Sequence, residues 1–314
     1  MSERFQRIAV VGLGLLGGSL AQAARERGLA GRVVGTGRRT AALAEARRRG
    51  IVDETAPVEQ AVRGADLVVL ATPVGAMEPL LRAAAGHLEA GALVTDVASV
   101  KGVLADTLPG VLPPGVEYVG SHPMAGSHRR GVEHARADLF EGAACIVTPT
   151  PGASEAAVRR IEAFWTALGA RVVRRDPAAH DREVAWTSHL PHVLAFAFAR
   201  ALADAPPGAR EVAGSGFRDF TRIARSDAEL WSEILGANHK AIAGPLQRVA
   251  ERLAEMARAL ESGDGEALER LLAAAREALA RIAPCGDFDA RSGGENPEIT
   301  PPRAGTQRSE STDS

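Results

Sequence analysis

The sequence predicts a doubly wound α/β domain followed by an all-α half. In the first 176 residues, short β-branched apolar runs alternate with Ala-rich segments of helical length, and this alternation is typical of a parallel sheet with helices on both faces. From about Asp176 the strand patterns stop, and long segments rich in Ala, Leu and Arg follow. We therefore expect a sheet domain over residues 1–176, a helical domain over 177–283 and a disordered tail over 284–314, where Gly, Pro, Ser and Thr are frequent.

The composition narrows the kinds of partner that this chain can have. The formal net charge is -2 over 314 residues, which gives no electrostatic reason to expect nucleic acid or an anionic membrane as a partner. No apolar run approaches the roughly 20 residues that span a bilayer, and the N-terminus lacks the apolar core of a signal peptide. The two cysteines, Cys145 and Cys285, have no metal-ligand spacing. We expect a cytoplasmic protein without a bound metal.

A glycine-rich turn directly follows the first predicted strand, residues 7–11, and precedes a predicted helix over residues 15–27. The order strand, G-x-G-x-x-G, helix predicts a Rossmann-type dinucleotide site. Gly12 permits the tight turn, Gly14 lets the backbone approach a pyrophosphate, and Gly17 lets the helix pack closely on the strand. The first helical residues, Leu15 and Leu16, then offer free N–H groups and the positive end of the helix dipole to the phosphates.

The end of the second predicted strand, residues 32–36, bears on which dinucleotide is bound. NAD-binding folds usually carry an Asp or Glu here that binds the ribose 2′-hydroxyl. This chain has Gly37, Arg38 and Arg39 instead, and two guanidinium groups suit the 2′-phosphate of NADP. The sequence therefore favours NADP over NAD as the cofactor. The alternative is that both arginines simply begin a solvated helix.

Strands and helices continue to alternate up to residue 175. Further strands are expected at residues 65–71, 92–97, 117–121, 143–148 and 171–175, with helices at 76–88 and 154–168. Thr72 and Pro73 follow the strand 65–71 and are expected to contact the cofactor. Ligands of parallel sheets lie beyond the carboxyl ends of the strands. We therefore expect four polar residues that follow strand ends to converge near the nicotinamide: Ser99, Lys101, His122 and Ser127.

Long helices are expected in the second half, over residues 180–203, 238–260 and 265–282. The second of these carries apolar residues from Ile242 to Leu260 at spacings that alternate four and three, which forms an a/d stripe for helix packing. Pro245 predicts a kink or a helix start just before it. The stripe can be an ordinary core face or a dimer seam, and we favour a homodimer built by this half.

Histidines in two segments are candidates for chemistry. His122 lies in the Gly- and Pro-punctuated segment 120–127, and histidine can pass a proton in either direction near neutral pH. Segment 187–192 places His189 and His192 three residues apart beside a proline. A metal site there is conceivable, but few carboxylates or thiols lie nearby to complete it. Capture of an anionic ligand or packing in a tight bend is the favoured interpretation.

An arginine in the segment 214–224 is a candidate anion-binding group. Arg222 lies among aromatic residues in this glycine-rich stretch, where a guanidinium could clamp a carboxylate through paired hydrogen bonds. The alternative is a surface ion pair, in which Arg218 or Arg222 pairs with Asp219 or Asp227.

Together these motifs resemble those of the prephenate/arogenate dehydrogenase family of tyrosine biosynthesis. The resemblance covers about residues 7–282, and its most specific segments are DVASVKG (96–102), GSHPMAGS (120–127), LFEG (139–142), TSHLPH (187–192) and GFRDFTRIA (216–224), together with Trp231. It implies oxidation of the C4 hydroxyl of prephenate by hydride transfer to NAD(P)+, with loss of the ring carboxylate as CO2 to give 4-hydroxyphenylpyruvate.

The resemblance also implies roles for individual residues. His122 would accept the hydrogen bond from the substrate hydroxyl and then its proton, and Ser99 would orient both groups. The implied substrate-binding residues are Arg222 at a carboxylate, His189 near the side-chain end of the substrate, Ser127, and Trp231, which would reach the partner's site across a dimer. One departure is His128, at a position that is often acidic in relatives.

Other functions remain open at this stage. Arogenate dehydrogenase or a dual-specificity cyclohexadienyl dehydrogenase would differ only in whether the substrate side chain carries an amino or a keto group. A β-hydroxyacid dehydrogenase would need a catalytic lysine in the helical half, where Lys240 lacks the expected glycine-rich context. A non-catalytic dinucleotide-sensing regulator would be expected to have lost His122, Ser99 or Arg222, and all three are present.

Overall fold

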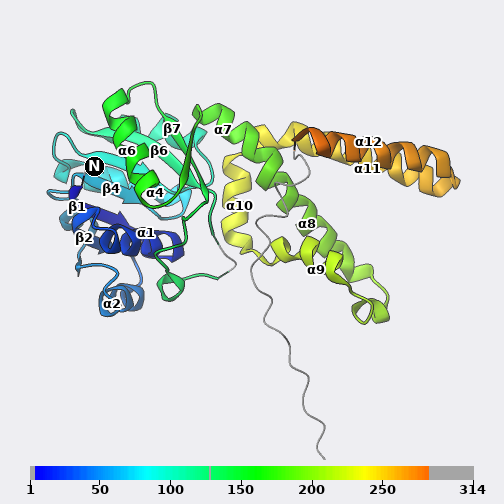
Figure 1. Cartoon of the computed structure of the whole chain (residues 1–314), viewed down its shortest axis with the longest axis horizontal. Coiled ribbons are helices and arrows are strands. Elements are labelled where there is room, and N and C mark those ends of the chain that lie inside the picture. Colours follow the sequence, from blue (N-terminus) through cyan, green and yellow to red (C-terminus); the bar gives the residue numbers. More distant parts are fainter. Residues whose placement is uncertain (1–3, 127–128, 283–314) are drawn as a thin grey trace, which may run out of the picture. The chain divides into compact units, whose positions relative to one another are not determined.

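A computed structural model describes residues 4–126 and 129–282 of the chain. It divides into two compact units, residues 1–248 and 249–314. The first unit contains the sheet and the helices as far as the start of the longest one (Figure 1). The predicted tail over 284–314 lies outside the described residues. None of the described helices is long and apolar enough to cross a membrane.

The strands form one eight-stranded sheet, and Figure 1 shows several of them side by side. The strands are β1 (Phe5–Val11), β2 (Ala30–Thr36), β3 (Glu54–Thr55), β4 (Leu67–Leu70), β5 (Leu93–Asp96), β6 (Glu117–Pro123), β7 (Ala144–Pro149) and β8 (Arg171–Arg174). Their order is β3-β2-β1-β4-β5-β6-β7-β8, in which the first six follow the Rossmann order 3-2-1-4-5-6. The predicted Rossmann-type fold is confirmed.

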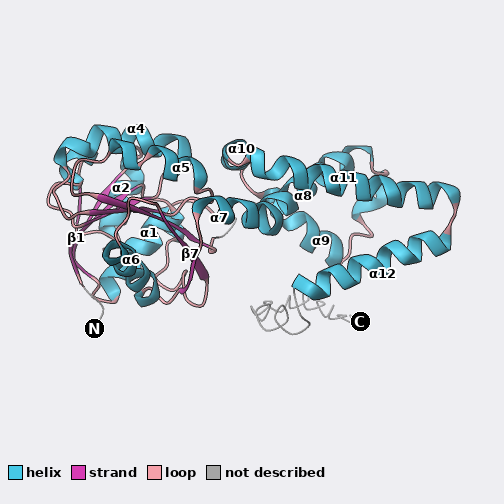
Figure 2. Cartoon of the chain, turned by 90° about the horizontal axis from the view of Figure 1, so that it is seen from above, coloured by secondary structure: helices cyan, strands magenta, loops and turns pink. Residues whose placement is uncertain are grey.

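Helices cover both faces of this sheet, and Figure 2 shows α4 and α5 on one side and α1 and α6 on the other. The helices of this domain are α1 (Leu15–Glu26), α2 (Thr40–Arg48), α3 (Val58–Ala61), α4 (Val74–Ala84), α5 (Gly102–Thr107) and α6 (Glu155–Ala167). Leu20 of α1 and Ile161 of α6 belong to one buried apolar cluster, whereas Met77 of α4 and Leu104 of α5 belong to a second. The β-branched strands are buried because both of their faces are covered in this way.

The prediction of a wholly parallel sheet is wrong for its last two strands, because β7 and β8 run opposite to the other six. β7 pairs with β6 in the antiparallel direction, whereas the other neighbours are parallel. Among the described residues between β6 and β7, the regular structure is a short 3-10 turn, Val132–His134. Two parallel neighbouring strands usually need a crossover helix between them. Without such a helix, the chain turns around after β6, and β7 pairs beside β6 in the opposite direction.

In the described chain as far as residue 282, the regular elements after β8 are all helices, as predicted, and several begin where the sequence supplies a cap. They are α7 (Pro177–Val184), α8 (Leu190–Ala201), α9 (Ser215–Arg222), α10 (Ala228–Ala237), α11 (His239–Ser262) and α12 (Gly265–Ile282). The side chains of Asp176 and Asp227 accept hydrogen bonds from the first turns of α7 and α10, which stabilises a helix start. The predicted last helix, residues 265–282, matches α12.

Two helix predictions differ from the structure. The predicted single helix over 180–203 begins earlier, at Pro177, and is interrupted by a π-helical turn, Ala185–His189. Pro191 lies in the first turn of α8, and since proline has no N–H to donate, the wider turn accommodates the missing bond. Helix α11 runs through Pro245 from His239, so a helix start just before this proline is excluded.

Candidate active site

The glycine turn lies where a dinucleotide would bind in this sheet order. Between β1 and β4 the order reverses, and this switch point is where open α/β sheets bind ligands. Gly12 has φ +106°, and a Cβ atom there would lie 2.5 Å from the carbonyl oxygen of Ala71. A Cβ atom at Gly17 would lie 2.0 Å from the carbonyl oxygen of Gly12, whereas at Gly14 it would meet nothing within 4 Å.

The three glycines therefore have the different steric surroundings that their predicted roles require. Gly12 and Gly17 allow close backbone packing, and Gly14 leaves open space at the start of α1. No side chain caps the N-terminus of α1 and no acidic residue lies in its first turn, so the N–H groups there can meet an anion. Across the switch point, the hydroxyl oxygen of Thr72 is buried without a hydrogen-bond partner among the described residues. An open cradle beside an unpaired hydroxyl fits a dinucleotide.

The predicted 2′-phosphate residues lie at the adjacent strand end. β2 ends at Thr36, and α2 begins at Thr40 with Arg39 as its N-cap residue. Arg38 and Arg39 are both exposed, and neither makes an ion pair with a residue in the described ranges. This cationic helix N-terminus suits an anion better than an isolated surface arginine does.

A buried polar network joins the ends of β5 and β6. Of its members, the sequence analysis proposed only Lys101 as a site residue. The ammonium group of Lys101 is fully buried, pairs with Asp96 and donates to the Ser121 carbonyl at 2.7 Å. The Tyr118 hydroxyl donates to the second Asp96 oxygen at 2.7 Å. Burial lowers the pKa of Lys101, while the charge of Asp96 opposes this shift. Because Ser121 immediately precedes His122, the network fixes the backbone that carries this histidine.

His122 lies near the carboxyl end of β6, at the sheet edge that also carries the glycine turn. β1, β4, β5 and β6 are parallel, so their carboxyl ends meet there. The ring is 6% exposed, and burial, with smaller contributions from His180 and Lys101, holds its pKa well below the usual value. His122 is therefore neutral at pH 7 and able to accept a proton. Its Nδ1 lies 2.8 Å from Nε2 of His180, a partner that sequence reasoning missed.

His189 lies in a second cluster, built from α8, α10 and the π-helical turn. The ring is completely buried, and burial lowers its pKa to about 4. The side-chain nitrogen of Asn238 lies 3.0 Å from Nδ1 of His189 and donates to the Asp181 carbonyl at 2.9 Å. Since an amide nitrogen can only donate, Nδ1 is the acceptor and Nε2 carries the proton. The Ser99 backbone interacts with the His189 ring and raises its pKa. Even so, no group among the described residues meets hydrogen-bonding geometry at Nε2, which is therefore buried without a hydrogen-bond partner there.

The remaining predicted substrate residues lie partly around this second cluster. Trp231 stacks on His192 of its own chain, with ring centroids 3.5 Å apart, and meets the His189 ring edge-on at 6.0 Å. Arg222, the last residue of α9, is exposed, and its charge lowers the pKa of His192 after the larger effect of burial. Whether Trp231 reaches a partner's site stays a prediction. Ser127 and His128 lie outside the described residues.

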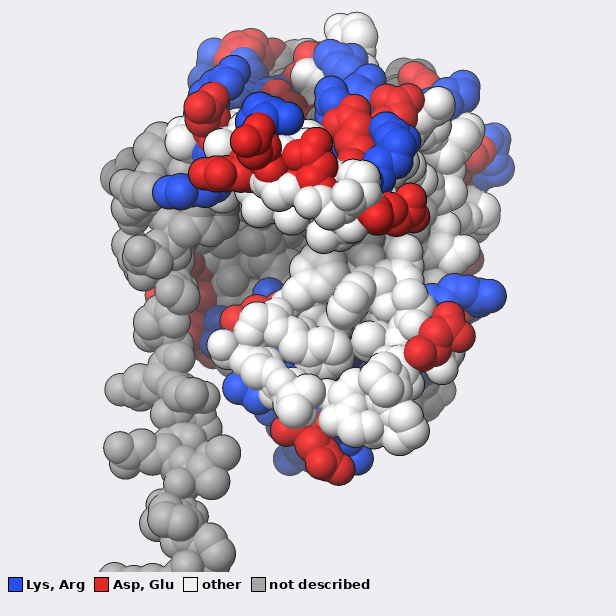
Figure 3. Space-filling view, turned by 90° about the vertical axis from the view of Figure 1, so that its right-hand side faces the viewer, with Lys and Arg blue, Asp and Glu red and all other residues white. Residues whose placement is uncertain are grey.

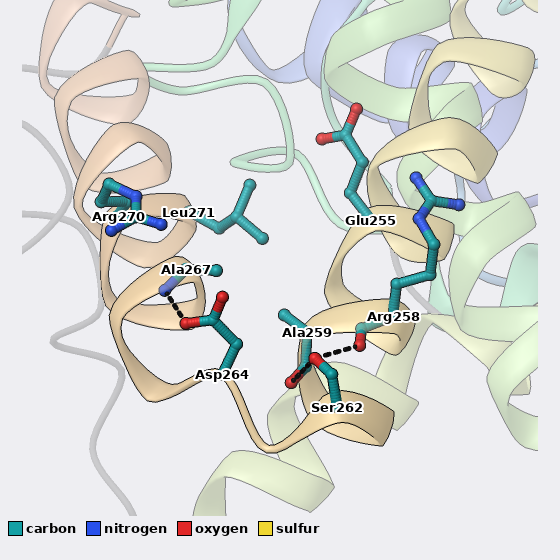
Figure 4. Close-up of a pocket in the computed structure, with 8 residues that line it drawn as sticks. All are labelled: Glu255, Arg258, Ala259, Ser262, Asp264, Ala267, Arg270 and Leu271. Carbon is teal, nitrogen blue, oxygen red and sulfur yellow. Dashed lines mark hydrogen bonds between the residues drawn. The ribbon is translucent and has the colours of Figure 1, made fainter.

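Two alternative interpretations of these segments, a surface ion pair and a metal site, can be compared with the structure. Asp227 pairs with Arg130 rather than with the arginines of α9, and Arg222 makes no ion pair in the described ranges. Among these residues, no group of three or more His, Cys, Asp or Glu side chains could hold a metal ion. A cavity of about 450 Å³ is lined by α11, α12 and Asp264 in the turn between them (Figure 4), and none of the predicted site residues lines it.

The comparisons with known proteins agree with this geometry. Residues 20–174 match the family model of the prephenate dehydrogenase nucleotide-binding domain, and residues 176–274 match that of the prephenate dehydrogenase dimerization domain. The chain is 32% identical to the prephenate dehydrogenase of Bacillus subtilis, over 88% of this chain and 76% of that protein. It is 34% identical to the cyclohexadienyl dehydrogenase of Zymomonas mobilis, over 84% and 92%. The crystal structure of prephenate dehydrogenase from A. aeolicus with hydroxyphenyl propionate and NAD+ superposes with a TM-score of 0.81, at 30% identity and 90% and 100% coverage.

Proposed function

Because the chain belongs to the prephenate dehydrogenase family of NAD-dependent oxidoreductases, we propose that it converts prephenate to 4-hydroxyphenylpyruvate and CO2. The observation that carries this proposal is His122, a neutral imidazole at the sheet edge where the dinucleotide turn lies. An alcohol oxidation needs such a base aligned with the hydride acceptor. The dinucleotide, when bound, supplies that acceptor.

In this reaction, His122 transfers the proton and Ser99 positions the reacting groups. His122 takes the proton of the C4 hydroxyl as the hydride leaves the same carbon. The bond to the ring carboxylate then breaks, its electrons aromatise the ring, CO2 departs, and His122 can return the proton to the phenolate oxygen. Ser99 follows the end of β5 at the same edge, where it can orient His122 and the hydroxyl.

The second cluster supplies groups for the anionic side chain of the substrate. The buried Nε2–H of His189 has no acceptor of hydrogen-bonding geometry among the described residues, and a substrate oxygen can satisfy it. Arg222 offers a guanidinium beside the His192–Trp231 pair, and arginine binds carboxylates through paired hydrogen bonds. The family resemblance also implies Ser127 as a substrate-binding residue. A lysine-based β-hydroxyacid mechanism is not favoured, because Lys240 is exposed.

Four parallel assays test this function, with prephenate or arogenate as substrate and NAD or NADP as cofactor. We expect near-UV absorbance from reduced cofactor with prephenate, and a stronger signal with NADP, which Arg38 and Arg39 favour. A signal with arogenate alone would show that the substrate is the amino compound, and the proposed mechanism would still apply. Silence in all four, with cofactor still bound, would overturn the proposal and favour a dinucleotide-sensing regulator.

Two variants separate proton transfer from substrate binding in these assays. His122→Asn should lower kcat by about 10²- to 10⁴-fold, the usual contribution of a general base, while the affinity for the dinucleotide stays unchanged. Arg222→Gln should mainly raise KM for the substrate. Unchanged activity in His122→Asn would refute the role of His122 as the proton acceptor. An unchanged KM in Arg222→Gln would refute the role of Arg222 in binding a substrate carboxylate.

We further infer a cytoplasmic homodimer that pairs through the helical half. The dimerization-domain model covers residues 176–274. Among the described residues, the exposed large apolar side chains lie in the helical half, except Val103 and Met124. Figure 3 shows a broad area with few charged side chains on one face of the molecule. Exposed apolar surface of this kind usually marks an interaction site.

A further inference from the structure

Two histidines and an aspartate form a buried line that ends at the base of the proposed reaction. Nδ1 of His122 lies 2.8 Å from Nε2 of His180, and Nδ1 of His180 lies 2.8 Å from an oxygen of Asp181. Resting on the function proposed above, we propose that His180 and Asp181 are positioning residues. They fix the proton of His122 on Nδ1, which leaves Nε2 unprotonated to take the substrate proton.

The assignment of protons starts at Asp181, whose carboxylate can only accept. The backbone N–H groups of Lys101 and Gly102 donate to its two oxygens, each at 2.8 Å. Burial raises the pKa of Asp181, but the hydrogen bonds from His180, Lys101 and Gly102 outweigh it and the net pKa is lowered. Asp181 is therefore ionised at neutral pH, so the nitrogen of His180 that faces it must carry a proton.

His180 then determines the state of His122. The His180 ring has no exposed surface, and burial lowers its pKa, against the opposing effect of Asp181. A neutral ring whose Nδ1 is protonated has an unprotonated Nε2, which can only accept. The facing nitrogen of His122 must therefore donate. Since His122 is itself neutral, the proton on Nδ1 leaves Nε2 free, as a base requires.

The supporting backbone is built to hold this line in place. A Cβ atom at Gly102 would lie 2.8 Å from an Asp181 oxygen, so glycine permits the carboxylate to reach both N–H groups. Asn238 binds the Asp181 carbonyl from the other side. The charged and titratable groups that act on His122 are His180, Lys101 and His189. When His122 gains a proton, the ionised Asp181 behind His180 stabilises the new charge electrostatically and does not itself become protonated.

The tautomer of His122 is measurable without any substrate. Long-range proton–nitrogen NMR spectra of the histidine rings distinguish the two neutral forms, and the His122 signals are identified by their loss in His122→Asn. We expect Nδ1 of His122 to carry the proton in the wild-type protein at neutral pH. A proton on Nε2 would overturn the proposal.

Two substitutions at His180 add a kinetic readout. Gln offers a side-chain oxygen that can still accept from Nδ1–H of His122, whereas Leu offers none. We expect His180→Leu to lower kcat about 100-fold with KM for substrate and affinity for dinucleotide unchanged, and to lose the single tautomer. His180→Gln should stay within about tenfold of wild type. The control is His87→Leu, a change of the same kind outside the site, with no expected effect on kcat.

The outcomes distinguish a failure of the positioning role of His180 and Asp181 from a failure of the proposed function. Equal losses in the Gln and Leu variants, or full activity in His180→Leu, would overturn the positioning role. If the wild-type protein oxidised neither prephenate nor arogenate, the proposed function would fail. The tautomer spectra would still decide whether His180 and Asp181 orient His122.

Discussion

At the scale of single residues, the site is a cluster of histidines that folding keeps neutral. His122, His180 and His189 all have lowered pKa values, with burial as the largest cause for each. Between its lowered pKa in the folded chain and about pH 6.5, such a ring binds a proton only when the chain is unfolded. The stabilisation is therefore complete above about pH 6.5 and is lost as the pH falls toward the folded-state pKa.

His189 gives a measurable size for this effect. Its pKa falls from the usual value of about 6.5 to about 4. At 1.36 kcal/mol per pKa unit, His189 therefore contributes about 3 kcal/mol to the stability that the chain loses in acid. We expect the free energy of unfolding, measured with urea at pH 7.5 and at pH 4.5, to fall less in His189→Gln than in wild type. His87→Gln is the control for the substitution itself. Parallel losses in wild type and His189→Gln would contradict the buried neutral histidine.

The sequence predicted His122 and His189 but not the groups that orient them. His122 lies in a loop-like glycine- and proline-rich segment, and His189 lies in an unusual break of an apolar helix, so both are visible locally. His180 is 58 residues from His122 along the chain, and Asn238 is 49 from His189. Nothing local marks those pairs, because His122 meets His180 only when the helical half packs on the sheet, and His189 meets Asn238 only when helices within that half pack together. The one visible signal was a His-Asp pair at the predicted start of a helix.

At the scale of elements, the strand and helix positions follow closely from the sequence, while the reversed direction of β7, and of β8 beside it, does not. β7 has the same β-branched, buried character as the parallel strands, since burial on both faces requires apolar residues whichever way a strand runs. Its direction depends on the connection from β6, where the described residues include no helix. At residues 187–192 the sequence predicted a tight bend, but not the π-helical geometry that the turn Ala185–His189 adopts.

The N-terminus of α2 carries the prediction on cofactor choice. Replacing both Arg38 and Arg39 with Ala should weaken NADP binding by about tenfold or more while NAD binding changes little, because a 2′-phosphate loses two charge-assisted partners that a 2′-hydroxyl does not need. Dissociation constants from quenching of protein fluorescence measure both affinities. Replacing Arg47 and Arg48 in the last turn of the same helix controls for net charge. If the double substitution weakened NAD and NADP binding equally, Arg38 and Arg39 would not recognise the 2′-phosphate, and the alternative of ordinary solvated arginines would hold.

At the scale of the whole molecule, the question is what covers the apolar stripe of the helical half. Leu253 and Leu260 of α11 belong to the predicted a/d stripe and are 56% and 64% exposed in the single chain. A core face would have buried these residues among the described helices, so the exposure favours the dimer interpretation of the stripe. Ile242, near the start of α11, is buried, which shows that the two ends of the same stripe meet different surroundings.

Changing these leucines to Glu should therefore separate the subunits without unfolding the chain. Exposed positions tolerate substitution at a cost near 0.5 kcal/mol or less, whereas a charge buried in an interface costs far more unless it is paired. We expect light scattering after size-exclusion chromatography to give a dimer for wild type and for the control Ala83→Glu on exposed α4 surface. Leu253→Glu with Leu260→Glu should give a monomer with an unchanged far-UV circular dichroism spectrum. A dimer that persists in this variant would place the seam on other helices of the half, and a monomeric wild type would remove the homodimer altogether.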